Sequence, residues 1–415
     1  MKDNIVLGKD SRALLLSNLT GSRKLAEVLA DIGVELYSYG EMLERLNKEL
    51  GSGTVLDVVK ETGFEDTGDE SDLINPRIFG GILLDHENPV HAEYMEKNNI
   101  KQFDIVDIEL EIPKRKPKFG DFLYGLKTER LSLARAAAKN FLRVISTLNL
   151  SEVEYHYLAE RIKEGGICLK DRFMFSEQAF TSSYKYLQFI SNVVYGYTSK
   201  HIADHYNEEF RLGDFDKMMA LISVYDKSGI KELAEKLNGY GINIYSSGGT
   251  AEEIKKAGID VTEISELTRF PESPEGLVKT LHPEIHRRLS SQEKSKDRFY
   301  LLVINFYPFG EEIKKEGCTI EDARRKIDIG GPSMILSAMR GFPWVIISTH
   351  PDSYEEIKIR LDRDPAVNAV EAYGFIKQCG IPPLLFYEYA IKNYFEKLEP
   401  EYVKNFYLKR FEKGF

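Results

Sequence analysis

The second half of the chain alternates short apolar runs with stretches that repeat at helical spacing. Residues 219–224 are mostly apolar, as in a strand that is buried on both faces of a sheet. The next apolar positions recur along one side of a helix, at Ile230, Leu233, Ala234 and Leu237. Gly241 is suited to end that helix. Further strands are predicted at residues 242–245, 259–264, 301–304 and 344–348.

This alternation predicts an α/β fold. Strand–helix–strand units cross over in the right-handed sense, which makes the sheet parallel and covers both of its faces. Ligands of such sheets bind beyond the carboxyl ends of the strands. After residue 348 the pattern turns helical, around residues 369–375 and 388–395, which predicts a helical extension.

The first half of the chain resembles the second. Related segments recur in the same order, with 22–40 matching 230–248, 74–78 matching 281–285, and 103–106 matching 300–303. Any two strand–helix–strand units share a periodicity, but a shared order of landmarks favours a duplication. We therefore predict two tandem parallel-sheet domains, residues 1–213 and 214–415, joined near Leu212 to Asp214.

Composition narrows the class of protein. The 415 residues are 42% hydrophobic and 29% charged, as in soluble globular domains. The net charge of −10 disfavours a nucleic-acid binder but is compatible with a local basic pocket. No apolar run of about 18 residues occurs, so neither a membrane span nor a signal peptide is expected. The cysteines Cys168, Cys318 and Cys379 form no zinc or disulfide pattern, which favours a cytoplasmic location.

Several candidate functional side chains lie close together in residues 276–283, between two apolar segments. Lys279, Thr280 and His282 bring a cation, a hydroxyl and an imidazole together ahead of Pro283. Such a loop is suited to holding an anion and polarising a carbonyl. Taken alone, the loop is better explained as a polar turn ended by Pro283.

Two further loops share the chemistry of an anion site. Residues 223–229 and 246–250 each follow a predicted strand and open a helix, whose first backbone amides attract phosphate. Lys227 adds a charge to the first loop, and glycines in the second allow close approach of a ligand. Either loop alone is explained as a helix cap, but their convergence with Lys279 favours one anion site.

Two later segments add aromatic rings that could bind a planar ligand and a carboxylate that could act as an acid. Residues 305–309 end a strand with an amide, a phenol and two further rings, which is also typical of an aromatic core edge. Residues 328–332 place Asp328 on a glycine turn, which alone would be read as a helix cap.

The order of these motifs closely resembles the IMP cyclohydrolase domain of the bifunctional AICAR formyltransferase/IMP cyclohydrolase, which has a methylglyoxal-synthase-like, Rossmann-like fold. The resemblance covers most of residues 217 to 400, and the first half resembles the same domain more faintly. We find no formyltransferase signature in the sequence. The matching motifs are residues 223–229, 246–250, 277–283, 305–309 and 328–332.

The resemblance implies that FAICAR, a formylated aminoimidazole carboxamide ribotide, is closed to IMP with loss of water, without a cofactor or metal. It assigns the oxyanion to Lys279, proton transfer to Asp328, and orientation of the base to Tyr307, with a hydrogen bond from Asn305. Arg340 takes the place of a lysine that is a catalytic candidate in the family. The implied substrate-binding residues are Ser223, Lys227, Ser246, Ser247, Gly248, Gly249, Thr250, Thr280, Asn305, Ile329 and Gly330.

Departures from the family pattern suggest a division of labour. Leu277 replaces an arginine, and Arg340 is a poor proton carrier because a guanidinium hardly deprotonates. The first half has lost the phosphate loops but retains the family segment 135–140. We expect one composite site, to which the first half lends Lys139 and Arg135. Alternatively, Arg135 and Lys139 lie on a solvated helix face and the first half is structural.

Two classes of function stay open. The chain is expected to be an IMP cyclohydrolase, because Lys279, Tyr307 and Asp328 are kept together. Loss of the lysine at Arg340 favours the alternative, a catalytically inactive nucleotide-binding or partner subunit of a separate AICAR formyltransferase. A methylglyoxal synthase fits less well. The expected partner is a small nucleotide, not nucleic acid or a membrane. The two halves are expected to form a pseudo-dimer, and a further homodimer is an open alternative.

Overall fold

Two parallel five-stranded sheets organise the molecule. The computed structural model describes residues 3–113, 118–207, 209–211, 218–293, 295 and 297–412. The first sheet has the strand order β4-β3-β2-β5-β6 and the second has the equivalent order β11-β10-β9-β12-β13. All neighbouring strands in both sheets are parallel. The prediction of an α/β fold with two tandem, Rossmann-like parallel sheets is confirmed.

Each half runs through the same succession of elements. The first contains β1 (Asn4–Ile5), β2 (Arg12–Leu16), α1 (Thr20–Asp31), β3 (Glu35–Ser38), α2 (Gly40–Leu50), β4 (Val55–Asp57), α3 (Val58–Thr62), η1 (Glu70–Leu73), α4 (Pro76–Leu83), α5 (Pro89–Lys97), β5 (Ile105–Ile108), α6 (Phe119–Tyr124), α7 (Thr128–Lys139), β6 (Ile145–Leu148), α8 (Glu152–Lys163), β7 (Ile167–Cys168), α9 (Leu169–Tyr195) and α10 (Ser199–His205). The second contains β8 (Glu209–Arg211), β9 (Met219–Ser223), α11 (Ile230–Gly239), β10 (Asn243–Ser246), α12 (Gly248–Lys256), β11 (Thr262–Glu263), α13 (Ile264–Thr268), η2 (Pro274–Gly276), α14 (Pro283–Ser290), β12 (Phe299–Ile304), α15 (Phe309–Glu312), α16 (Ile320–Arg325), α17 (Gly330–Arg340), β13 (Ile346–Ser348), α18 (Pro351–Arg363), β14 (Ala366–Asn368), α19 (Ala369–Phe375), η3 (Ile376–Gly380), α20 (Ile381–Phe395) and α21 (Pro400–Glu412).

Small antiparallel pairs repeat as well. β1 pairs with β7 in the first half, and β8 pairs with β14 in the second. The predicted junction near Leu212 to Asp214 lies outside the described residues, so the boundary between residues 213 and 214 stays a prediction.

Alternate residues of the strands bury opposite faces of each sheet. Along β2, Ala13 and Leu15 pack into a cluster with Leu25 of α1, whereas Leu14 and Leu16 join a larger cluster with Leu131 of α7. Burial on both faces explains why these strands are continuous apolar runs instead of alternating ones.

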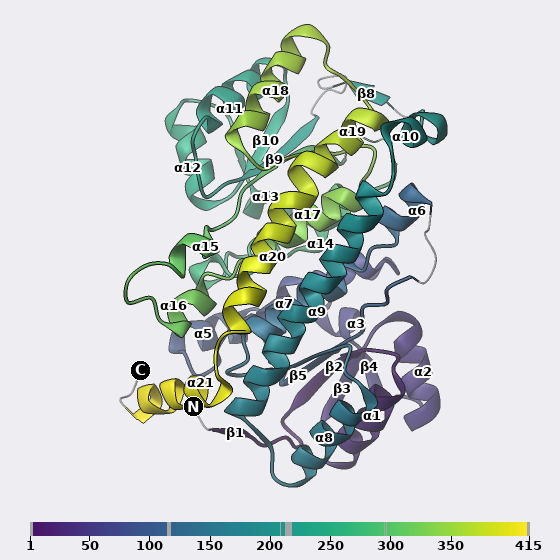
Figure 1. Ribbon diagram of the computed structural model, residues 1–415, viewed down its shortest axis with the longest axis vertical. Helices are drawn as coiled ribbons and strands as arrows, with labels where there is room; N and C mark the ends of the chain where they lie inside the picture. The colour runs from purple at the N-terminus through teal and green to yellow at the C-terminus, as the bar shows by residue number, and fades with distance from the viewer. Residues whose placement is uncertain are drawn as a thin grey trace.

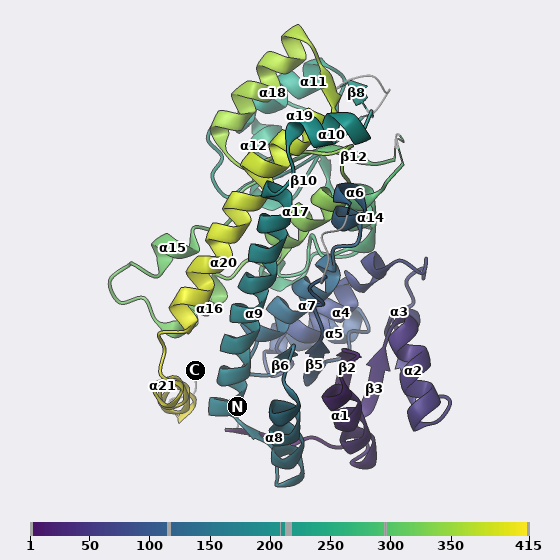
Figure 2. The same cartoon turned by 45° about the vertical axis from the view of Figure 1, so that its right-hand side comes forward.

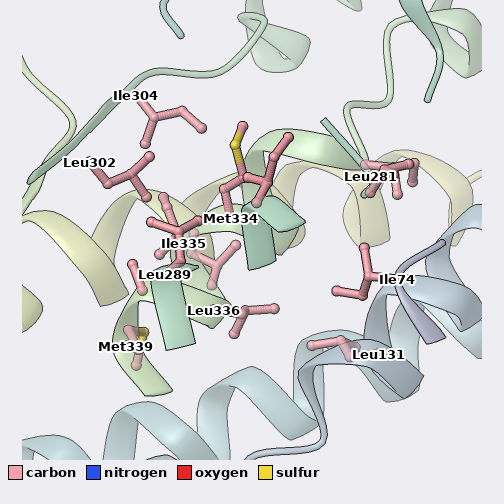
Figure 3. Close-up of a cluster of buried hydrophobic side chains, with 14 of the residues drawn as sticks. Ile74, Leu131, Leu281, Leu289, Leu302, Ile304, Met334, Ile335, Leu336 and Met339 are labelled. Atoms are coloured by element: carbon pink, nitrogen blue, oxygen red, sulfur yellow. The ribbon is translucent and has the colours of Figure 1, made fainter. Parts of the chain in front are cut away.

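The larger cluster is one continuous core shared by both halves. Helices α9 and α20 run side by side across the middle of the molecule, with α7 and α17 nearby (Figures 1 and 2). Figure 3 shows Ile74 and Leu131 of the first half in one group with Leu281 and Leu336 of the second. The hydroxyl of Ser333 on α17 donates to that of Ser132 on α7 over 2.7 Å. The two halves therefore meet along equivalent helices, as the subunits of a two-fold dimer do.

Differences from the predicted elements occur mainly at their ends. The predicted strand 259–264 is only Thr262–Glu263, because Glu263 and Glu266 form a capping box that starts α13 at Ile264. The predicted helix at residues 388–395 belongs to the longer α20. Within the described part of the chain, no helix combines the length and the apolar character needed to cross a membrane.

Candidate active site

A cleft of about 680 Å³ opens at the carboxyl ends of the second sheet. Loops after β9, β10 and β12 line it together with residues 275–280 and 325–331, as expected for a parallel sheet. Leu83 and Lys139 of the first half also line it. Most residues predicted to form the site therefore meet in one place, and the first half contributes to its wall.

The start of α12 has the features of an anion site. Ser247 caps this helix without a side-chain hydrogen bond, and its buried hydroxyl has no partner among the described residues. A methyl group at Gly248, which has φ 52°, would lie 3.1 Å from Nζ of Lys279, and one at Gly249 would lie 3.8 Å from Cε of Lys227. Two cations thus lie beside the positive end of a helix, where glycine leaves space for them.

Two residues predicted to contact the substrate have their side chains engaged within the protein. The Ser246 hydroxyl is fully buried, donates to Ile222 O over 2.7 Å, and does not line the cleft. The Thr250 hydroxyl donates to Val224 O and accepts from Val224 N. These hydroxyls join the loops after β9 and β10, so they shape the anion site and do not offer their protons to a ligand.

Asn305 lines the cleft, but its amide also holds neighbouring backbone. Its Oδ1 accepts from Tyr225 N over 2.6 Å and from Asp226 N over 2.9 Å, and its Nδ2 donates to Asp226 O over 3.0 Å. The expected hydrogen bond from Asn305 to the base stays a prediction. The contacts of Asn305 within the protein fix the loop that carries Lys227.

Asp328 lies at the start of α17 with its backbone held on both sides. Its N–H donates to Oη of Tyr387 over 2.6 Å, and its carbonyl accepts from Nη2 of Arg135 over 2.9 Å. Oδ1 accepts from Gly331 N over 3.1 Å. A methyl group at Gly331 would lie 2.6 Å from Oδ2 of Asp328, and one at Gly330 would lie 2.4 Å from Oγ1 of Thr280. A larger residue at either position would have to displace the side chain of Thr280 or Asp328.

Lys139, the last residue of α7, enters the cleft from the first half. Its ammonium donates to Ile327 O over 2.7 Å and to Arg325 O over 3.3 Å, and only 8% of the residue is exposed. Burial, reinforced by the charge of Arg324, lowers the pKa of Lys139 to about 8, while Asp328 opposes the shift. Lys139 can therefore gain and lose a proton near neutral pH, and it does not lie on a solvated helix face.

Arg340, the last residue of α17, occupies the position equivalent to Lys139 and points to the first half. It pairs with Glu129 and lies 3.6 Å from Asp69, and its Nε donates to Tyr124 O over 3.1 Å. It does not line the cleft, so its expected catalytic role is corrected. The two-fold relation of α7 and α17 explains the placement, because each helix carries its last residue into the opposite half.

Tyr307 offers a ring at the mouth of the cleft. It is 38% exposed, and its ring centroid lies 4.4 Å from that of Tyr225. Nζ of Lys326 lies 4.3 Å from the centroid of the Tyr307 ring. A planar ligand can pack against such a pair of rings.

Leu277 and His282 both make contacts within the protein. Leu277 lines the cleft and also packs against the first-half cluster of Leu84, Met95 and Ile100. Nδ1 of His282 accepts from Glu284 N over 3.2 Å, and burial lowers the pKa of His282 to about 4. His282 does not line the cleft and acts as the cap of α14.

Several lining residues escaped the sequence analysis. They are Leu83 at the end of α4, Tyr225 within the loop 223–229, Glu275 of η2, and four residues of the long segment between β12 and α17: Glu312, Asp322, Arg325 and Lys326. Glu275 has φ 57°, an uncommon conformation for a non-glycine residue. Only the tertiary fold brings these residues to the cleft, since charged residues are frequent along the whole chain.

Comparison with known proteins relates the second half to a defined group. Residues 229–333 match the family model of the MGS-like domain. The "Bifunctional purine biosynthesis protein PurH" of Caldicellulosiruptor bescii is 35% identical over 193 residues, which make up 44% of this chain and 37% of that protein. The chain thus contains an MGS-like domain and is related to a purine biosynthesis protein, although it covers well under half of that protein's length.

Two solved structures resemble parts of the chain weakly. The crystal structure of ForH is 25% identical and covers 43% of this chain and 93% of its own, with a TM-score of 0.34. The A chain of dipicolinate synthase from Bacillus subtilis is 10% identical and covers 96% of this chain and 99% of its own, with a TM-score of 0.17. Both scores are too low to say anything about the site.

Proposed function

We propose that this chain is an IMP cyclohydrolase that closes the purine ring of FAICAR to IMP with loss of water. The observation that carries the proposal is the meeting of Lys139 and Asp328 in a cleft that also holds a lysine-rich anion site. The relation to a bifunctional purine biosynthesis protein supports the same substrate class.

The substrate's phosphate would bind at the start of α12. The free backbone amides, the hydroxyl of Ser247 and the ammonium of Lys227 supply donors and positive charge there. Ser223, Thr280, Ile329 and Gly330 line the same cleft and complete its wall. The base would pack against Tyr307.

Ring closure needs one new bond and the loss of water. The carboxamide nitrogen attacks the formyl carbon, forming the C–N bond, and the formyl oxygen becomes an alkoxide that takes up a proton. The nitrogen then gives up its protons and the oxygen departs as water, which leaves a C=N bond. No electrons are exchanged with a second reactant, so the protein has to position groups, stabilise the oxyanion and move protons.

Asp328 and Lys139 would accept the protons of the attacking nitrogen and return them to the oxygen, first as the alkoxide becomes a hydroxyl and then as water departs. A lysine with a pKa of about 8 is present in both protonation states near neutral pH, as this exchange requires. Lys139 would thereby supply the amine that the second half lacks at Arg340. Lys279, beside the start of α12, would stabilise the oxyanion through its flexible side chain.

The proposal includes the origin of the chain as two diverged copies of the domain, residues 1–213 and 214–415. Equivalent strand orders and equivalent helix contacts support it. Only the second copy would bind nucleotide, because ion pairs of Arg340 with Glu129 and of Arg130 with Glu70 occupy the equivalent region of the first.

Turnover of FAICAR by the purified chain tests the proposal. IMP formation, followed by absorbance, is expected for the wild type and for Lys256→Ala, which removes an exposed lysine from the far end of α12. Lys279→Ala is expected to lower kcat by about 100-fold, the loss typical of a missing oxyanion donor. A rise in KM at unchanged kcat would make Lys279 a phosphate ligand only. Tight IMP binding without wild-type turnover would support the inactive nucleotide-binding or partner subunit instead.

A further inference from the structure

We propose that the buried ion pair of Arg135 and Glu388 positions Asp328 for proton transfer. Glu388 is then a positioning residue, which affects kcat without touching the substrate. The inference rests on the proposed function and extends it to helix α20. Neither residue lines the cleft.

The pair fixes Asp328 through its backbone. Arg135 and Glu388 are 1% and 0% exposed, and Nε of Arg135 lies 2.5 Å from Oε1 of Glu388. The same guanidinium donates Nη2 to the carbonyl of Asp328 over 2.9 Å. On the other side, Tyr387 accepts from the Asp328 N–H and donates to Lys326 O. Glu388 thus orients an arginine of the first half, and that arginine orients the acid of the second.

The opposite half of the molecule provides an internal comparison. There Lys127 stands in the place of Asp328, and its N–H donates to Oη of Tyr186 over 3.3 Å, just as Asp328 does to Tyr387. The tyrosine contact is therefore common to both halves. The ion pair is not, because the positions equivalent to Arg135 and Glu388 hold Leu336 and Leu187, both buried.

This asymmetry separates a positioning role from a stabilising one. A buried ion pair is often no more stabilising than apolar side chains of similar volume, since both charges lose their hydration. The buried leucines at the equivalent positions on α17 and α9 show that this fold accepts apolar side chains there. Of the two equivalent places, the charged pair occurs at the one beside Asp328, whose carboxylate lines the cleft. The pair therefore serves the site and is not needed for packing of the core.

Arg135 also acts on the second proton-carrying group. Burial is the main cause that lowers the pKa of Lys139, and the charges of Arg324 and Arg135 lower it further. Arg135 therefore lies within electrostatic reach of both Lys139 and Asp328, and a change in its position alters both.

The double variant Arg135→Leu/Glu388→Leu tests the inference by copying the pair of the opposite half. We expect kcat for ring closure to fall by about 10-fold to 100-fold, as for small displacements of catalytic groups. KM is expected to change by less than about 3-fold, because the anion site is untouched. The thermal unfolding midpoint is expected to stay level or rise, because no unpaired charge remains buried.

Two further variants sharpen the result. Glu388→Gln keeps the shape and an acceptor for Arg135, so we expect it to retain more activity than the double variant. Leu187→Met/Leu336→Met changes the two equivalent positions on α9 and α17, away from Asp328, and is expected to leave kcat unchanged. The split between kcat and KM distinguishes positioning from a general loss of folded protein.

A double variant with wild-type kcat would overturn the inference. Unfolding of both the double variant and Glu388→Gln would also overturn it, because the pair would then serve stability. A wild-type chain without turnover would refute the proposed function and its extension together, whereas an active wild type with an equally active double variant would refute the extension alone.

Discussion

A single buried amine carries much of the proposed chemistry. Lys139 comes from the half that has lost its own phosphate loops, yet its ammonium binds the carbonyls of Arg325 and Ile327 in the other half. Burial makes its charge costly, and the carbonyls and Asp328 compensate only in part. The residue is therefore held in a state that favours proton release.

The buried amine predicts a stability difference that depends on pH. Its folded pKa of about 8 lies below the ordinary value of 10.5, so the unfolded chain binds more protons between these values. Relative to Lys139→Met, the wild type should gain stability as pH rises from 8 to 10.5, by up to about 3 kcal/mol. Urea unfolding of both proteins at several pH values measures this, and parallel curves would contradict the lowered pKa.

A larger side chain at Gly331 should disturb Asp328. A methyl group there would lie 2.6 Å from Oδ2 of Asp328, so Gly331→Ala should displace the carboxylate and lower kcat by about 10-fold or more. Gly374 in α19 has open space around it, and Gly374→Ala should leave kcat unchanged and keep or raise stability. Steady-state kinetics and thermal unfolding of the two variants decide the matter. Equal activity would mean that the acid is not at Asp328.

At the scale of elements, the proposed anion site forms at the start of α12 from several groups, each of which is weak evidence alone. The open helix end, Ser247, Lys227 and Lys279 come from segments that are far apart in the sequence. The parallel sheet brings them together, because successive strands end at the same edge. None of these features would identify an anion site alone.

Removal of one charge should weaken nucleotide binding at this helix. We expect Lys227→Ala to raise the Kd for IMP by about 10-fold, and the effect to shrink at high salt, because an exposed charge is screened. Lys256→Ala removes a lysine from the opposite, C-terminal end of α12 and should leave the Kd within about 2-fold of the wild type. Titration calorimetry at two salt concentrations compares them. Equal losses in both variants would point to general electrostatic attraction.

The sequence predicts elements better than it predicts the engagement of side chains. Apolar runs and a glycine stop located the strands of the second sheet, since burial leaves a clear periodic pattern, and the repeat extended this fold to the first half. Thr250 and Asn305 also belong to the cleft, but their polar atoms bind backbone of the neighbouring loop. Nothing in a sequence distinguishes a hydroxyl that faces a ligand from one that holds a loop.

Arg340 shows a second limit of sequence reasoning. Its place in the motif suggested a role in its own half, whereas the contact of α7 with α17 carries it to Glu129 in the other. The same exchange carries Lys139 to Asp328. Such pairings depend on how the halves are arranged, which no local motif records.

At the scale of the whole molecule, a pseudo-dimer lets the halves diverge. A homodimer would have two identical clefts, but one chain can lose the first and keep the second. Here the first half keeps the helix that serves the other half, and its own region fills with ion pairs. The shared core joins the halves and fixes the position of Lys139 in the cleft.

The composite site is tested most directly by the kinetics and IMP affinity of Lys139→Ala beside the wild type. The proposed role predicts that kcat for IMP formation falls by about 100-fold or more while the Kd for IMP changes little, because the anion site lies wholly in the second half. Wild-type kcat in Lys139→Ala would contradict it and leave the first half as a structural support.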